Sequence, residues 1–151
     1  MHSENLNALV KSAQLVEIIT FELNAKRSKG TSSLSEGVPL QIEVQPQYNL
    51  EIGAKPDNLG FIVKLSLQLE LPHGTIRCEV GATYSLKNPI DFPLDTSALI
   101  EYSNEVAVMT LLPFMRQHIA DLSQRVLGFP LLMPILLRGV VHFDLEQVKT
   151  S

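Results

Sequence analysis

Four histidines and one cysteine are the side chains of this chain best suited to catalysis or metal binding. The histidines lie far apart in the sequence, and no two have the spacing of metal ligands. His118 directly precedes Ile119 in a helical pattern, so we interpret it as packed or half-exposed, not as a general base. We interpret the others in the same way; the full set is His2, His73, His118 and His142.

Cys78 alternates with Ile76 and Val80 along an apolar pattern. This placement predicts a buried small side chain, because no helix N-terminus or basic neighbour is evident that would lower the pKa of the thiol. A single cysteine also excludes an internal disulfide.

The carboxylates do not form a recognisable acid–base pair. The sequence has no glycine-rich phosphate loop, no GxSxG, no HExxH and no paired Cys-x-x-Cys. We therefore expect no enzymatic activity, no cofactor and no metal. The glutamates on predicted strands are interpreted as a solvated face: Glu17, Glu22, Glu43, Glu51, Glu70 and Glu79.

Length and charge narrow the class of protein. The chain has 151 residues, so we predict a single domain over 1–151. Twelve basic and sixteen acidic residues give a net charge of −4, which argues against a nucleic-acid partner.

The N-terminus lacks the pattern of a signal peptide. The apolar stretch 126–141 is shorter than a membrane span and is interrupted by Pro130, Pro134 and Arg138. We expect a cytoplasmic protein with no membrane insertion.

Two-residue alternation predicts four strands. They cover 14–23, about 40–52, 61–71 and 76–86, and the last two are joined by a tight turn at 72–74. Pro46 predicts a bulge or an edge in the second strand. The segments 25–37, 53–60 and 87–96 are predicted loops, and the last of these crosses from the sheet to the helix.

The first strand has apolar residues on both sides. Leu15, Ile19, Phe21 and Leu23 share one side by alternation, with Glu17 as the exception, and Val16 and Ile18 lie on the other. Such a strand is covered on both faces or pairs with a partner, so we predict a homo-oligomer.

Helical spacing dominates the second half of the chain. Pro113 interrupts this pattern, so we predict a short helix over 97–109, a break or kink, and then a main helix to about 126. Gly128 and Pro130 end it. Residues 1–11 are predicted to be loose or to form one or two helical turns, and 143–151 to form a short helix or to fray, with a loose tail at 147–151. One apolar stripe defines the main helix: Val108, Leu112, Met115, Ile119, Leu122 and Val126.

These elements predict an α+β fold: a four-stranded antiparallel sheet with the main helix on its apolar face. The long aliphatic strands and the apolar segment after Gly128 exceed what one such layer hides. Excess of this kind is typical of an oligomer interface or of a site for apolar ligands or peptides.

The order of several short motifs resembles the SecB family of protein-export chaperones. The resemblance spans most of 14–146. The motifs are IITFEL at 18–23, IRCEV at 76–80, LLPFMR at 111–116, Phe-Pro at 129–130 with Leu132 and Pro134, and HFDL at 142–145.

The resemblance implies an ATP-independent holdase that binds unfolded polypeptides in grooves between sheet and helix, and that assembles as a dimer of dimers. For each groove residue, a core or subunit-interface role is the alternative. Carried onto this chain, the groove residues are Leu40, Ile42 and Val44, then Ile90, Phe92 and Leu94 of the crossover, then Val108, Leu112 and Met115 of the helix.

Other roles follow from the same resemblance. Glu22 and Glu79 match acidic residues that dock the SecA translocase motor, while Ile18 replaces an aspartate of that pattern. Cys78 and Val80 match positions near the contact between dimers. The short segment after Leu145 leaves little room for the family's last helix and acidic tail.

These departures keep a second function open, because relatives of the family serve as chaperones for the antitoxin of a toxin–antitoxin system. A carrier of small apolar ligands or lipids is a third hypothesis, based on the same sheet–helix cavity.

Overall fold

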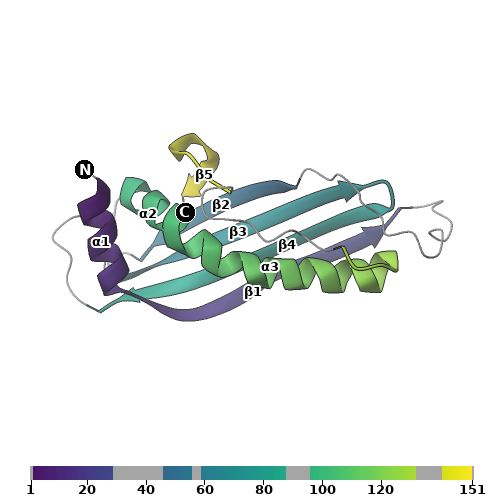
Figure 1. Ribbon diagram of the computed structural model, residues 1–151, viewed down its shortest axis with the longest axis horizontal. Coiled ribbons are helices and arrows are strands. Elements are labelled where there is room, and N and C mark those ends of the chain that lie inside the picture. Colours follow the sequence, from purple (N-terminus) through teal and green to yellow (C-terminus); the bar gives the residue numbers. More distant parts are fainter. Residues whose placement is uncertain (1, 29–45, 56–58, 88–95, 132–140, 151) are drawn as a thin grey trace.

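The computed structural model describes residues 2–28, 46–55, 59–87, 96–131 and 141–150. Its elements are, in order, α1 (His2–Ser12), β1 (Ala13–Arg27), β2 (Gln47–Ala54), β3 (Gly60–Leu71), β4 (Gly74–Leu86), α2 (Thr96–Tyr102), η1 (Ser103–Ala107), α3 (Val108–Leu122), η2 (Ser123–Leu127), η3 (Leu145–Gln147) and β5 (Val148–Thr150). The predicted α+β fold is confirmed, with one long sheet and one main helix along it (Figure 1).

The sheet has five strands in the order β1-β4-β3-β2-β5. The predicted antiparallel pairing of the first four strands is present. The predicted count of four was low, because β5 adds a short parallel strand beside β2. Three residues are too few to show a two-residue alternation, so the sequence carried no signal for this strand.

The β3–β4 hairpin is the most regular part of the sheet. Leu71 pairs with Gly74 across the Pro72–His73 turn, close to the predicted position. A side chain at position 74 would come within 2.1 Å of the Lys26 carbonyl oxygen. Glycine is therefore required there, because it lets the end of β1 lie close to the hairpin.

Two β-bulges change the faces of β1. The register shifts between Leu15 and Glu17 and again between Thr20 and Glu22. An extra residue at each bulge reverses which side the next residues face. The predicted grouping of Leu15, Ile19, Phe21 and Leu23 on one side was therefore wrong. Leu15 and Leu23 pair with Tyr84 and Cys78 on the helix-covered face, whereas Ile19 pairs with Gly81 on the other.

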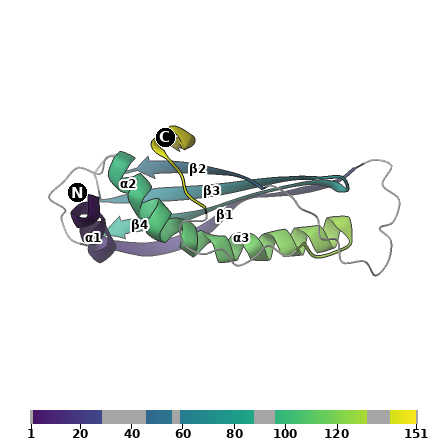
Figure 2. The ribbon, with the colours of Figure 1, turned by 45° about the horizontal axis from the view of Figure 1, so that its top comes forward.

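The helical segment runs without interruption from Thr96 to Leu127. The predicted break at Pro113 is absent. This proline lies inside α3, and its side chain is exposed. The change of direction occurs instead between α2 and α3, at the π-helical turn η1 (Figures 1 and 2). A π turn inserts one extra residue and rotates the apolar stripe around the helix axis.

The N-terminal residues form the helix α1, which is longer than the one or two turns predicted. Leu9 is fully buried and explains why this segment is held in place. Figure 2 shows α1 and α2 at the same end of the sheet, and α3 running along it towards the other end. No helix among the described residues is both long and apolar enough to cross a membrane.

The core lies between α3 and one face of the sheet. Val63, Leu65 and Leu67 of β3 are completely buried, and so are Leu111 and Met115 of α3, which belong to the same apolar cluster. At the α2 end, three rings fill the core: Phe61 stacks on Tyr84 at 5.0 Å between centroids, and Tyr102 meets both edge-on.

Polar contacts fix the C-terminal end of the helix against the rest of the fold. Gly128 has φ 87° and its N–H donates to the Ser123 carbonyl, so glycine ends the helix as predicted. The Ser123 hydroxyl accepts a bond from the Leu131 N–H. Arg27 of β1 donates to the Leu127 carbonyl, which fixes the helix end against the edge strand.

Candidate polypeptide-binding surface

Three of the nine predicted groove residues lie in the described part of the chain. Val108, Leu112 and Met115 are 0%, 3% and 0% exposed, so in this conformation they are core residues on the buried side of α3. This is the alternative that the sequence left open. The other six lie outside the described residues: Leu40, Ile42, Val44, Ile90, Phe92 and Leu94.

Among the described residues, the largest group of exposed large apolar side chains belongs to β1. This strand is at one end of the strand order, so one of its edges has no neighbour among the described strands. Among the described residues, β1 thus combines a fifteen-residue strand at the sheet edge with exposed apolar side chains. The exposed fractions are 41% for Leu15, 60% for Val16, 41% for Phe21 and 45% for Leu23; Phe114 on α3 is 41% exposed.

Phe21 lies on the sheet face opposite α3. Its ring lies against Gly81, where an added Cβ would be 2.6 Å from the ring edge. The Lys64 ammonium lies 4.5 Å from the ring centroid, a cation–π contact. The bulge therefore places a large aromatic ring on a mostly polar face.

Glu22 and Glu79 lie side by side on that same face, as paired residues of β1 and β4. Glu22 forms an ion pair with Arg77, in which both side chains are about two-fifths exposed. Arg77 also donates to Gln68. The glutamates are on the accessible face that docking would need, but one of them is already paired with a cation of this chain.

Cys78 and Val80 are fully buried within this single chain. Their side chains face the core under the helix, so a contact between subunits at these positions would have to be indirect. Burial raises the pKa of the Cys78 thiol to about 11, with further contributions from the charges of Glu22 and Glu79. This is the environment of a structural cysteine, not of a nucleophile.

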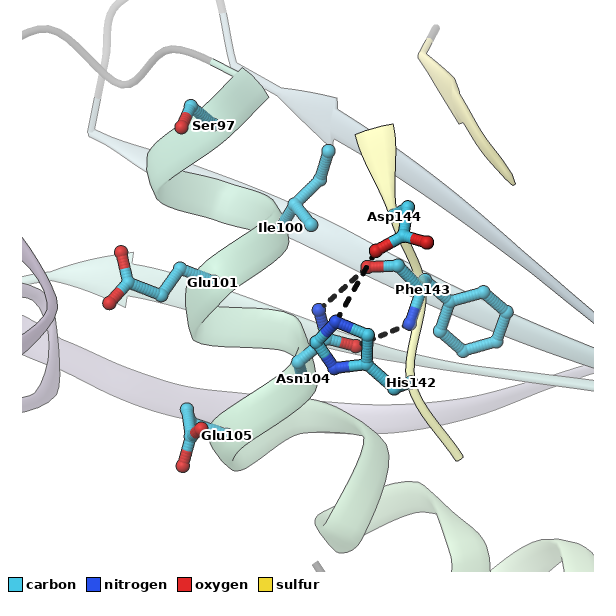
Figure 3. Close-up of a pocket in the computed structure, with 8 residues that line it drawn as sticks. All are labelled: Ser97, Ile100, Glu101, Asn104, Glu105, His142, Phe143 and Asp144. Carbon is cyan, nitrogen blue, oxygen red and sulfur yellow. Dashed lines mark hydrogen bonds and ion pairs between the residues drawn. The ribbon is translucent and has the colours of Figure 1, made fainter. Parts of the chain in front are cut away.

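A separate cleft of about 380 Å³ lies between the helix and the segment that returns after it (Figure 3). Ile100 and Phe143 supply apolar surface, and carboxylates from both sides form its rim. Among the described residues, no group of three potential metal ligands is close enough to hold an ion. The lining residues are Ser97, Ile100, Glu101, Asn104, Glu105, His142, Phe143 and Asp144.

Asn104 connects the two sides of this cleft. Its carboxamide donates to the Phe143 carbonyl at 2.9 Å and accepts from the Phe143 N–H at 2.8 Å (Figure 3). The amide thus satisfies both backbone groups of one residue, as a neighbouring strand would. Sequence reasoning missed Asn104, because the π turn that presents it has no recognised sequence pattern. The HFDL motif around Phe143 was the one available signal.

The mostly antiparallel sheet with one long helix along it is a SecB-like fold. A solved structure with this fold is the SecB-like chaperone Rv1957 of Mycobacterium tuberculosis, in complex with a ChAD peptide from the HigA1 antitoxin Rv1956. The TM-score is 0.72 at 19% sequence identity, and the match covers 90% of this chain and 96% of that chain.

A protein of unknown function from Streptococcus agalactiae also matches, with a TM-score of 0.44 and 8% identity over 81% of this chain and 96% of its own. That score is too low to carry an argument. No protein-family model matches the sequence. No curated protein matches it either.

Proposed function

We propose that this protein is an ATP-independent chaperone that binds polypeptides in an extended or unfolded state. The observation that carries the proposal is the group of exposed apolar side chains that the described residues place on β1 and at Phe114 on α3. The SecB-like fold supports it. Exposed apolar patches of this kind are typical of sites for other chains, and holding an unfolded chain requires no reaction chemistry.

The proposal is tested by suppression of aggregation. An unfolded client is diluted into the protein at a stoichiometric ratio without nucleotide, and light scattering is followed. Scattering should fall several-fold with the wild type. Phe114→Ser should suppress aggregation less well, because an exposed ring on the helix is lost.

The matched control for this variant is Leu59→Ser, which removes a side chain that is 61% exposed and directly precedes β3. This control should behave as the wild type does. Failure of the wild type to reduce scattering for several unrelated clients would contradict the proposed function.

Among possible clients, an antitoxin is favoured over proteins destined for export. The neighbour Rv1957 was solved with a peptide from an antitoxin. Export would require docking of the SecA motor on the polar sheet face, where Glu22 is engaged by Arg77. An aspartate of the docking pattern is replaced by Ile18, which pairs with the buried Ala82 and so lies on the other face of the sheet.

The two client classes can be separated by one pair of measurements. A toxin–antitoxin gene pair beside this gene, with an antitoxin tail that co-purifies with the protein, is the result expected for the dedicated chaperone. Micromolar binding of SecA, weakened by Glu79→Gln, is the result expected for the export chaperone. Glu22→Gln can serve as a second variant in the SecA measurement. The Glu22–Arg77 pair is surface-exposed and contributes under about 1 kcal/mol to the free energy of unfolding, so its loss does not unfold the protein.

A carrier of small apolar ligands is disfavoured by the cleft described above. Glu101, Glu105 and Asp144 lie on its rim. An apolar ligand there would desolvate carboxylates, which costs free energy. Detection of a lipid released from the purified, denatured protein would reverse this preference.

A further inference from the structure

The segment 141–150, here called the strap, ends in the weakest pairing of the sheet. Its strand β5 pairs with β2 at three positions only: Leu50 with Val148, Glu51 with Lys149 and Ile52 with Thr150. This pairing is parallel, whereas every other pairing in the sheet of the described residues is antiparallel. Parallel pairing is slightly less stable per residue, so this short ladder is the part of the sheet that opens most easily.

The strap has one buried anchor, and beyond it most of its side chains are exposed. Phe143 is 4% exposed and is bound on both backbone groups by the buried Asn104. After Phe143, the side chains of Asp144, Glu146, Gln147 and Lys149 are exposed, and Val148 is half-buried. A capping box between Asp144 and Gln147 gives this part local order without tying it to the sheet. Asn104 and Phe143 therefore form the anchor of the strap, here called the hinge, and β5 is the end farthest from this anchor along the chain.

The edge of β2 that β5 covers alternates apolar and charged side chains. Leu50 and Ile52 face the core and are almost fully buried, while Glu51 faces the opposite side, where it forms an ion pair with Lys64 at 3.5 Å. The strap fits this edge with an apolar residue beside Leu50 and a cation beside Glu51. Figure 1 shows β5 lying along β2 near the end of the sheet that carries α2.

We propose that β5 of the strap can be displaced from β2, and that an extended segment of a bound polypeptide then pairs with β2 in its place. Backbone hydrogen bonds to a sheet edge give affinity without sequence identity, and alternate side chains give preference. The chemistry of the strap identifies the occupant: an extended segment with an apolar residue at the Val148 position and a basic residue at the Lys149 position. This inference rests on the proposed polypeptide-binding function and adds a second subsite to it.

A reversible covalent lock tests the proposal. In the double variant Glu51→Cys with Lys149→Cys, the two positions are directly paired on neighbouring strands, at a separation that a disulfide can bridge. The probe is fluorescently labelled, reduced and carboxymethylated lactalbumin, which stays unfolded. The oxidised variant should bind this probe at least tenfold more weakly than the same protein after reduction. Loss of free thiols measures the locked fraction, and the native Cys78 is buried and does not interfere.

The matched control is the double variant Gln47→Cys with Gln68→Cys, which locks β2 to β3 on the same sheet face. Its affinity for the probe should not depend on reduction. Equal affinity of the oxidised and reduced strap variants would overturn the strap proposal while leaving the proposed function intact. Absence of probe binding in every variant and in the wild type would overturn the proposed function, and the strap proposal with it.

Weakening the hinge should have the opposite effect. Asn104→Ala removes both hydrogen bonds to Phe143, so the strap is open in a larger fraction of molecules and the probe should bind several-fold tighter. Faster amide hydrogen exchange at 50–52 would accompany this change. Unchanged or weaker binding by a folded Asn104→Ala protein would contradict the proposal, and the disulfide lock keeps the proposal testable if this variant does not fold.

Discussion

Cys78 is the residue whose chemistry is changed most clearly by its place in the fold. The thiol lies fully buried between the sheet and α3, and its pKa is raised to about 11 from a reference value of 9.0. Because the thiolate is the reactive form, a thiol with this pKa is inert at neutral pH. The lone cysteine therefore belongs to the packing of the core and not to a catalytic site.

We predict that native Cys78 resists alkylation at pH 8 and reacts fully only after unfolding. The raised pKa also predicts a pH dependence of stability. Between pH 9 and about 11 the folded state binds more protons than the unfolded state, so this contribution is complete below pH 9 and is lost as the pH rises to about 11. Urea midpoints measured from pH 8 to 11 should fall less steeply for Cys78→Ala than for the wild type. Rapid labelling of the native protein would show that the thiol is accessible.

At the scale of elements, the continuous helix from α2 to η2 determines how the sheet is covered. The apolar stripe from Val108 to Ile119 could be predicted, because a period of 3.6 residues is visible in the sequence. The π turns could not, because each inserts one residue without any characteristic composition. The bulges in β1 were missed for a related reason. The prediction assumed strict alternation, and an extra residue at a bulge reverses the face of every residue that follows it.

The candidate site was harder to predict than the fold. The apolar character of β1 was visible as alternation on both sides, and its exposed residues follow from that pattern. Asn104 and β5 were not predicted, since a single buried amide and a three-residue strand depend on contacts between distant segments. Whether Val108, Leu112 and Met115 line a groove or a core depends on what covers them, which sequence spacing does not encode.

Pro113 offers a prediction at this scale. It lies inside α3, has no N–H to donate to the Met109 carbonyl, and has an exposed side chain with little packing to lose. Pro113→Ala should therefore raise the free energy of unfolding by about 1–2 kcal/mol, after allowance for the greater freedom of the unfolded chain. Urea denaturation at fixed protein concentration measures this change as a higher midpoint. The exposed Gln117→Ala is the control, and a lower midpoint for Pro113→Ala would mean that the proline stabilises the helix.

At the scale of the whole molecule, the two edges of the sheet differ. The β2 edge is covered by a strand of this chain, whereas the outer edge of β1 has no partner among the described strands and carries exposed apolar residues. Natural sheets protect long edges, because an open edge pairs with other chains. The difference indicates separate roles. The backbone edge of β1 is suited to a contact with a second copy, which leaves Phe21 on the sheet face and Phe114 on α3 for bound polypeptides, and the β2 edge is suited to exchange.

We therefore predict a homo-oligomer, a dimer or a dimer of dimers, formed through the β1 edge. Val16→Lys combined with Leu23→Lys adds two charges along this edge, where the side chains are 60% and 45% exposed. These side chains are accessible in the single chain, so the charges should reduce the mass in solution without unfolding the subunit. Light scattering coupled to size exclusion at micromolar concentration measures the mass, and circular dichroism monitors the fold. Val10→Lys on α1, with a similar exposed fraction of 50%, is the control and should leave the mass unchanged. A wild-type protein that stays monomeric at these concentrations would contradict the prediction, and so would a lysine double variant that keeps the wild-type mass.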